Sequence, residues 1–504
     1  YDSLLKGVSG KRLVRRISGG AFVPVEGSEI EPENGKDIVT TLDVNIQDIT
    51  QTALMRMMIS NEALEGCAIV MEVATGKIKA IANLGRMPDG SYFETDNYAL
   101  KTSEPGSVIK LVTLLSVLED KYVTTSDMID INNGSWMLNG RNIRDAEKSP
   151  KSLLTIKESF EHSSNVAMAK LAYTYYSKNP AQFIKHYEAL HLTARTGIDL
   201  KEEFRPLVKN PSRKDWHLQT LPSMGFGYEV MLSPLQLLMV YNAVANEGKL
   251  MKPYLVNRVE KDGNLLHEFE PQVLNNNICS EETLRQLKDC LDAVCIQGTA
   301  KSIFKDAVYH AAGKTGTTKV NDGKFKYGDA VYQSSFAGYF PAENPKYSCI
   351  VVIKNKPRAA KYFGGAVAAP VFREIADKLY AESADRQQLF IAKAATDSNK
   401  YRWSGYGSEL KNVLETMNVQ YTDSITSGKW GVVTNNAYTP LLKGLSISKQ
   451  TVPDVKGMGL KDALHLLENM NIKVTVKGKG KVTSQSLDAG LAINTGQTMA
   501  LELN

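Results

Sequence analysis

The chain has 504 residues, 43% of them hydrophobic, so it can bury more than one core, and a length of about 150 residues per domain predicts roughly three domains. Its 60 basic and 55 acidic residues leave a net charge of +5 without long runs of Lys or Arg, so we expect no nucleic-acid partner. Five scattered cysteines without a CxxC pair argue against both a disulfide framework and a tetrahedral zinc site.

The first segment, residues 1–36, is basic and then rich in Gly, Pro and Glu, without a sustained period. We interpret it as the end of a separate module. No apolar run approaches about 18 residues, which predicts neither a membrane-spanning helix nor a signal peptide. Because the chain begins at Tyr1, in what reads as the middle of a domain, we expect that an N-terminal anchor has been removed.

Regular structure is expected from residue 37 onward. The pattern predicts a strand over 37–42, an amphipathic helix over 45–58, and a strand, a turn and a second strand over 67–84. Further helices are expected over 107–120, about 153–176, and 233–247, the last with Ser233 as its cap and Pro234 at its first position. β-rich runs follow over 311–318, 334–341 and 347–355. Helices between an early hairpin and a late set of strands predict an α+β fold, in which helices cover one antiparallel sheet.

The C-terminal part contains an internal repeat. GYGSELKNVLETMNVQYT at 405–422 aligns with GMGLKDALHLLENMNIKVT at 457–475, and each copy predicts a glycine turn, an amphipathic helix and a strand. A chance likeness of two amphipathic helices is the alternative, but the matched LExMNV and LENMNI favour a true repeat. We expect Trp403 and Trp430 to pack inside the first copy.

The stretch SEPGSVIKLV, residues 103–112, places Ser107 and Lys110 in an apolar helical setting. Residues i and i+3 of a helix share a face, so the amine can reach the hydroxyl. Burial and a nearby cation would lower the pKa of Lys110 until it could act as a base, and the helix N-terminus could hold an oxyanion. SxxK occurs five times in the chain, so the motif alone favours a simple helix cap at Ser107.

Two other motifs accompany it. Ser163 and Asn165, in HSSN, interrupt a helical pattern. They mark either a helix kink or an exposed face, or else a loop or helix junction that presents a hydroxyl and an amide to a cleft. GKTGTT occurs once, and Lys314 and Thr315 could bind a carboxylate while Gly316 admits a peptide backbone. A turn is the alternative, and the spacing of a phosphate loop is absent.

The order of the three motifs, S-x-x-K, S-x-N and K-T-G, resembles that of penicillin-binding proteins and serine β-lactamases. Flanks such as EPGSVIK, SSNVAMAKLA, AGKTGTT and YFGGAVAAPVFREIA are similar to the transpeptidase domain of class B penicillin-binding proteins. The start resembles the end of that class's pedestal domain, and VPDVKGMGLKDALHLLENMNIKVTV resembles a PASTA domain. The expected division is therefore 1–36 pedestal, 37–384 transpeptidase with a five-stranded sheet, 385–450 PASTA-like and 451–504 PASTA.

The resemblance implies a role for each motif residue. Ser107 would be the acylated nucleophile, Lys110 its base, Ser163 the proton relay and Asn165 the substrate-binding amide. Lys314, Thr315 and Gly316 would polarise the site and bind the terminal carboxylate, and the backbone amides of Ser107 and Thr317 would form the oxyanion hole. We expect His162 to face solvent, while His310, Tyr327 and Tyr332 are candidates for the rim of the cleft.

The implied activity is cross-linking of peptidoglycan stem peptides that end in D-Ala-D-Ala, without a metal or a cofactor. The alternatives are a carboxypeptidase or β-lactamase-type hydrolase and a non-catalytic division scaffold that binds the cell wall. β-Lactams and division membrane proteins are the expected partners. The expected location is the extracytoplasmic face of the bacterial membrane, in septal wall synthesis.

Overall fold

The structure is a computed structural model, and it describes residues 1–382, 402–417, 419, 421–425, 430–435, 440–494 and 496–504. The chain divides into two compact units, Tyr1–Ala381 and Glu382–Asn504, which we describe separately.

An antiparallel sheet forms the centre of the first unit. In spatial order its strands are β17 (Ala312–Lys319), β18 (Tyr332–Phe340), β19 (Tyr347–Lys354), β4 (Glu65–Glu72), β5 (Ile78–Arg86) and β6 (Tyr92–Phe93). The early hairpin β4–β5 therefore lies beside the late strands, as the α+β prediction requires. The predicted five strands are corrected to six, because the two-residue strand β6 pairs with the end of β5 through Phe93 and Gly85.

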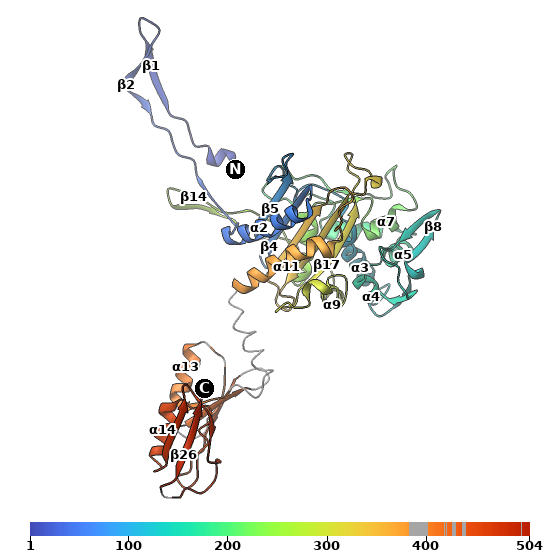
Figure 1. Cartoon of the computed structure of the whole chain (residues 1–504). Coiled ribbons are helices and arrows are strands. Elements are labelled where there is room, and N and C mark those ends of the chain that lie inside the picture. Colours follow the sequence, from blue (N-terminus) through green and yellow to red (C-terminus); the bar gives the residue numbers. More distant parts are fainter. Residues whose placement is uncertain (383–401, 418, 420, 426–429, 436–439, 495) are drawn as a thin grey trace. The chain divides into compact units, whose positions relative to one another are not determined.

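Helices cover both faces of this sheet. Figure 1 shows α2 and α11 across one face, and Phe372 of α11 packs edge to face on Phe336 of β18. The opposite face carries α8, whose residues are all buried and whose Asn242 Oδ1 accepts a bond from Ser348 Oγ of β19 at 2.7 Å. Its Ser233 caps the helix, with Pro234 at the first position, as the sequence predicts. The helices and 3-10 turns of the unit are α1 (Asp2–Leu5), α2 (Val44–Asn61), η1 (Gly106–Ile109), α3 (Lys110–Glu119), η2 (Asn132–Gly134), α4 (Ile156–Glu161), α5 (Asn165–Tyr176), α6 (Pro180–Ala189), α7 (Thr220–Phe226), α8 (Pro234–Ala245), α9 (Glu281–Ile296), α10 (Lys301–Phe304), η3 (Tyr327–Asp329) and α11 (Gly364–Glu382).

Short sheets surround this core. They pair β1 (Lys11–Arg16) with β2 (Phe22–Ile30), β7 (Met128–Asp130) with β10 (Leu153–Thr155), β8 (Ser135–Leu138) with β9 (Arg141–Arg144), β11 (Leu207–Val208) with β12 (Val230–Met231), β13 (Leu250–Met251) with β16 (Val273–Asn275), and β14 (Val256–Lys261) with both β3 (Asp37–Thr40) and β15 (Asn264–Glu268).

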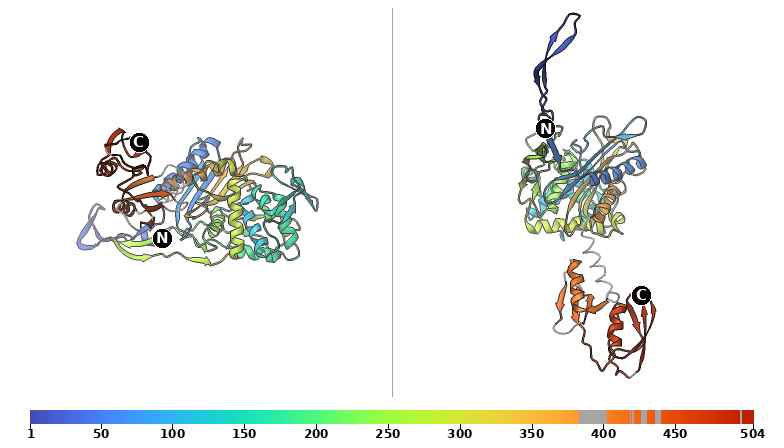
Figure 2. Two further views of the ribbon diagram at one scale, coloured as in Figure 1. Left: turned by 90° about the horizontal axis from the view of Figure 1, so that it is seen from below. Right: turned by 90° about the vertical axis from the view of Figure 1, so that its left-hand side faces the viewer.

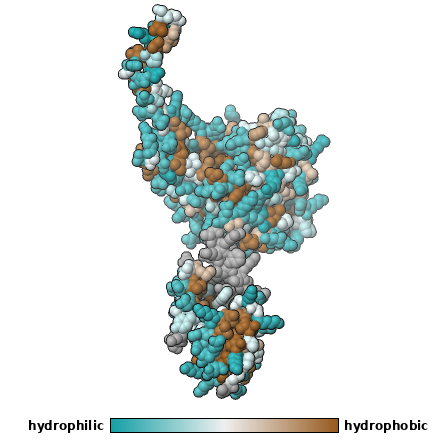
Figure 3. Space-filling view, turned by 60° about the vertical axis from the view of Figure 1, so that its left-hand side comes forward, coloured by the Kyte–Doolittle hydropathy of each residue, from teal (hydrophilic) through white to brown (hydrophobic). Residues whose placement is uncertain are grey.

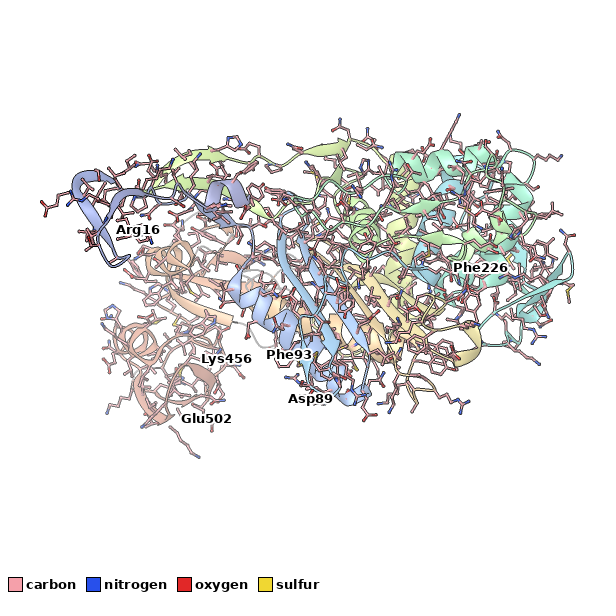
Figure 4. The ribbon with its side chains drawn as sticks, turned by 90° about the horizontal axis from the view of Figure 1, so that it is seen from above. Arg16, Asp89, Phe93, Phe226, Lys456 and Glu502 are labelled. Carbon is pink, nitrogen blue, oxygen red and sulfur yellow. The ribbon has the colours of Figure 1, made fainter. Side chains whose placement is uncertain are left out.

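The β1–β2 hairpin projects from its unit, with Arg16 near its tip (Figures 2 and 4). Figure 3 shows hydrophobic side chains on its surface, where Leu13 and Phe22 are 61% and 65% exposed.

The second unit contains two α/β repeats, which confirms the predicted duplication. The first contains β20 (Arg402–Tyr406), α13 (Gly407–Thr416), β21 (Thr422–Ser424), β22 (Trp430–Asn435) and β23 (Pro440–Gly444). The second contains α14 (Leu460–Glu468), β24 (Lys473–Gly478), β25 (Val482–Gln485) and β26 (Thr498–Leu503). In each repeat the strand after the helix pairs in parallel with a later strand, β21 with β23 and β24 with β26.

The two repeats pack on each other. Ser404 of β20 donates through its backbone nitrogen to Gly457 O at 2.9 Å. Trp430 packs against the core of the second repeat, and Trp403 is 45% exposed with Lys481 Nζ 4.7 Å from its ring centroid. The prediction that both tryptophans fill the first repeat is therefore only partly right. Trp430 does meet Tyr406 of the first repeat edge to face at 5.8 Å, but both tryptophans also contact residues of the second repeat, which sequence periodicity cannot pair with them.

Candidate active site

The nucleophile candidate Ser107 lies in the 3-10 turn η1, which leads directly into α3. The prediction of an α-helix from Ser107 is corrected to this tighter turn, in which residues i and i+3 eclipse each other. Gly106 has a φ of +59°, and its backbone nitrogen donates to Gly227 O at 3.1 Å. A Cβ on Gly106 would lie 1.9 Å from Thr318 Oγ1, so only glycine fits between this turn and strand β17.

Lys110 connects this turn with the junction between α4 and α5. Its side chain is fully buried, and Nζ donates to Ser163 O at 2.5 Å, to Asn165 Oδ1 at 2.7 Å and to Ser163 Oγ at 3.2 Å. Burial lowers the pKa of Lys110 to about 7, although the negative charge of Asp145 opposes that shift. Among the hydrogen bonds of the described residues, none joins Lys110 Nζ to Ser107 Oγ. In the unliganded structure Lys110 therefore contacts Ser163, whereas the nucleophile candidate Ser107 lies one helical turn away.

The S-S-N motif forms a helix junction, which was one of its two predicted interpretations. Helix α4 ends at Glu161, and α5 begins at Asn165 with Ser164 as its cap. Ser163 has a φ of +58°, a left-handed conformation that breaks the expected helix over 153–176 into two. The break turns the Ser163 hydroxyl and the Asn165 amide toward Lys110.

Asp145 organises this junction, and sequence reasoning missed it because RNIRDAE carries no recognisable catalytic pattern. Its Oδ2 accepts a bond from Ser164 Oγ at 2.8 Å, and its Oδ1 accepts one from Val166 N at 2.9 Å. The neighbouring Arg144 O accepts a bond from Asn165 Nδ2 at 2.8 Å, which fixes the amide with its oxygen toward Lys110.

Strand β17 presents the K-T-G motif beside the turn. Lys314 is fully buried, with Nζ 5.6 Å from the ring centroid of Phe160. Burial and then the positive charge of Lys110 lower the pKa of Lys314 well below its usual value. Thr315 Oγ1 shares a hydrogen bond of 2.7 Å with Thr299 Oγ1, and Thr317 Oγ1 accepts one from Gly364 N at 3.0 Å.

Gly316 allows the sheet and the turn to approach each other. A Cβ there would lie 2.2 Å from Ser335 Oγ and 3.2 Å from Val108 Cγ1, which is in the nucleophile turn. A Cβ on Gly364 would likewise lie 2.3 Å from Gly316 O. The three motifs therefore meet at one place, with η1 between the α4–α5 junction and β17.

Exposure separates the motif residues into two groups. Lys110 and Lys314 are buried, as is Thr315, whereas Ser107, Ser163, Asn165 and Thr317 are half-buried and can be reached by a ligand. This arrangement suits acyl transfer to a hydroxyl, because a desolvated amine can remain neutral near pH 7 and remove the proton. His162 is exposed at the end of α4, as expected.

The family model for the penicillin-binding protein transpeptidase domain matches residues 66–377, more than half of the chain. The chain belongs to the penicillin-binding protein transpeptidase family. A second family model, the PASTA domain, matches residues 450–504, where the resemblance had placed it.

Three similar proteins illustrate the relationship. The peptidoglycan D,D-transpeptidase FtsI of Buchnera aphidicola is 29% identical over 389 residues, which are 75% of this chain and 64% of that protein. Stage V sporulation protein D of Bacillus subtilis is 25% identical over 514 residues, covering 100% of this chain and 71% of that protein. The crystal structure of penicillin-binding protein 3 from Mycobacterium tuberculosis in complex with aztreonam has 26% identity and a TM-score of 0.60, covering 70% of this chain and 80% of that one. The chain thus spans less than two thirds of the FtsI relative.

Neither a membrane-spanning helix nor a metal-binding cluster is found among the described residues. Within them, no helix is long and apolar enough to cross a membrane. In the same part of the chain, no three His, Cys, Asp or Glu side chains are grouped to hold a metal ion.

Proposed function

We propose that this member of the penicillin-binding protein family is a class B peptidoglycan D,D-transpeptidase that works through an acyl-enzyme on Ser107. The arrangement that supports this most directly is the buried Lys110, with its pKa lowered to about 7, set between the Ser107 turn and the Ser163–Asn165 junction. The FtsI relative and the penicillin-binding protein 3 structure support the same chemistry.

In the first step, Ser107 Oγ attacks the carbonyl carbon of the penultimate D-alanine. Neutral Lys110 accepts the hydroxyl proton, and the backbone amides of Ser107 and Thr317 stabilise the oxyanion. Ser163 then carries the proton to the leaving nitrogen, and terminal D-alanine departs as the acyl-enzyme ester forms. In the second step an amine of a neighbouring strand attacks the ester, which forms the cross-link and frees Ser107.

The remaining motif residues would bind the donor peptide. Asn165 would hold its backbone amide, while Lys314 and Thr315 would bind its terminal carboxylate at β17. Gly316 would let the peptide backbone approach that strand. The same site would be acylated by β-lactams, whose ring amide takes the place of the D-Ala-D-Ala bond.

The cellular role of the protein is inferred from the same comparisons. We propose septal wall synthesis at the extracytoplasmic face of the membrane, with division membrane proteins as partners. The proposed division of the chain is 1–36 pedestal, 37–384 transpeptidase, and PASTA-like and PASTA domains over 385–450 and 451–504. The match to a sporulation protein, which covers 100% of this chain and 71% of that protein, favours a second candidate role, wall synthesis during sporulation.

Mass spectrometry after treatment with penicillin tests the acyl-enzyme. We expect one adduct, on the peptide that contains Ser107, and none in Ser107→Ala. An adduct that persists in Ser107→Ala would disprove the assignment. The hydrolase alternative is tested with a D-Ala-D-Ala donor and a diamino acid acceptor, where products formed mainly with water rather than with the amine would support hydrolysis.

A further inference from the structure

The loop that follows the K-T-G strand is held in place by specific contacts. Residues 320–331 connect β17 and β18, and Val320 N donates to Val331 O at 2.9 Å to close the base of the loop. Its first half is anchored on Lys354, which forms an ion pair with Asp322 and lies 5.2 Å from the ring centroid of Phe325. Its second half contains η3, which begins at Tyr327.

Tyr327 joins this loop to the segment before the nucleophile. Its hydroxyl donates to Glu104 Oε2 at 2.8 Å, three residues before Ser107, and its ring meets that of Tyr228 edge to face at 6.2 Å. Tyr228 in turn packs on Phe226, labelled in Figure 4. Of the hydrogen bonds in the described part of the chain, only this one connects loop 320–331 to the segment before Ser107.

Glu104 is held from both sides. Its Oε1 accepts a bond from Glu229 N at 2.9 Å, opposite the bond from Tyr327. Pro105 and Gly106 then lead to Ser107, so the position of Glu104 bears directly on the nucleophile turn. Both Glu104 and loop residues such as Asp322 line one cavity of about 300 Å³.

We propose that Tyr327 and Glu104 form a latch that holds loop 320–331 against the nucleophile turn and thereby positions Ser107 for acylation. Both are positioning residues, since they act through the turn. When the latch is lost, the loop opens more often, and of the two described bonds to its carboxylate Glu104 keeps the one from Glu229 N. The acylation step then slows because the turn is less well ordered, while initial ligand binding at β17 is unaffected.

Hydrogen exchange of the unliganded protein tests the latch without relying on the reaction. In Tyr327→Phe, which keeps the ring, we expect exchange in peptides within 320–331 to accelerate by about tenfold, the effect of losing one hydrogen bond to a charged group. Tyr332→Phe is the matched control: Tyr332 stacks on Tyr362 at 4.2 Å, and among the described residues its hydroxyl has no hydrogen-bond partner. Equal exchange in the two variants would overturn the proposal.

A second test measures the rate of acylation, and it rests on the proposed function. With a penicillin, we expect Tyr327→Phe to lower the rate of the covalent step several-fold at an unchanged dissociation constant for the preceding complex. In Glu104→Ala the same tyrosine substitution should have no further effect, because its partner is gone. Independent effects of the two substitutions would contradict the latch, whereas absence of any Ser107 adduct would contradict the proposed function and leave the exchange result to decide the latch.

Discussion

At the scale of single residues, the site depends on two buried lysines in different surroundings. Lys110 has three oxygen partners from the α4–α5 junction, whereas Lys314 donates to Thr315 O at 3.2 Å and lies over Phe160. A neutral Lys110 retains two N–H donors and gains a lone pair, so its contact with Ser163 Oγ can reverse and carry a proton. This makes Lys110 the better candidate for the base.

The pH dependence of acylation follows from the pKa of Lys110. Only the neutral amine can accept the Ser107 proton, and with a pKa of about 7 its neutral fraction rises as the pH increases through 7. We expect the acylation rate to be about tenfold lower at pH 6 than at pH 8. Stopped-flow measurements of penicillin acylation across this range check it, and a rate that falls as the pH increases would contradict it.

Replacing Asp145 should shift this profile. The carboxylate raises the pKa of Lys110, so Asp145→Asn should move the midpoint to lower pH while an amide of equal size preserves the cap of α5. The same acylation measurement shows the midpoint, and the melting temperature controls for loss of fold. A midpoint at higher pH would show that Asp145 does not act on Lys110 through its charge.

At the scale of elements, two substitutions at the α4–α5 junction can distinguish the role of the Ser163 hydroxyl from that of the backbone conformation at this residue. Ser163→Gly and Ser163→Ala both remove the hydroxyl that we propose as the proton relay, but only alanine is strained at a φ of +58°. We expect both to acylate slowly, and we expect alanine to be less stable by about 1 kcal/mol. Urea unfolding and penicillin labelling distinguish the two effects. Equal stability of the two variants would contradict the strain.

The sequence pattern predicted some of these elements correctly, others only as one alternative, and some not at all. The strands near β4, β5, β17, β18 and β19 and the helix α8 were predicted because strong apolar patterns and capping residues mark them. The break at Ser163 was predicted only as one alternative, since three polar residues in a helix pattern do not specify a left-handed backbone. Asp145 and Tyr327 gained their roles through contacts with residues distant in the chain, which no local pattern encodes.

At the scale of the whole molecule, the two units should unfold separately, since each has its own core. Trp430 packs on the core of the second C-terminal repeat, so Trp430→Ala should weaken the second unit by about 1 to 3 kcal/mol. Calorimetry should show one transition at lower temperature, while the transition that penicillin stabilises stays unchanged. A shift of the penicillin-sensitive transition would contradict this independence.

The glycines around the nucleophile turn limit how this protein could escape an inhibitor. At Gly106, Gly316 and Gly364 any side chain would collide with a neighbouring strand or turn. A larger residue at these positions therefore cannot narrow the space around Ser107 without disturbing the sheet. Substitutions that reduce drug sensitivity are therefore expected at surrounding side chains that can change without such collisions. Selection under β-lactam pressure should leave the three glycines intact.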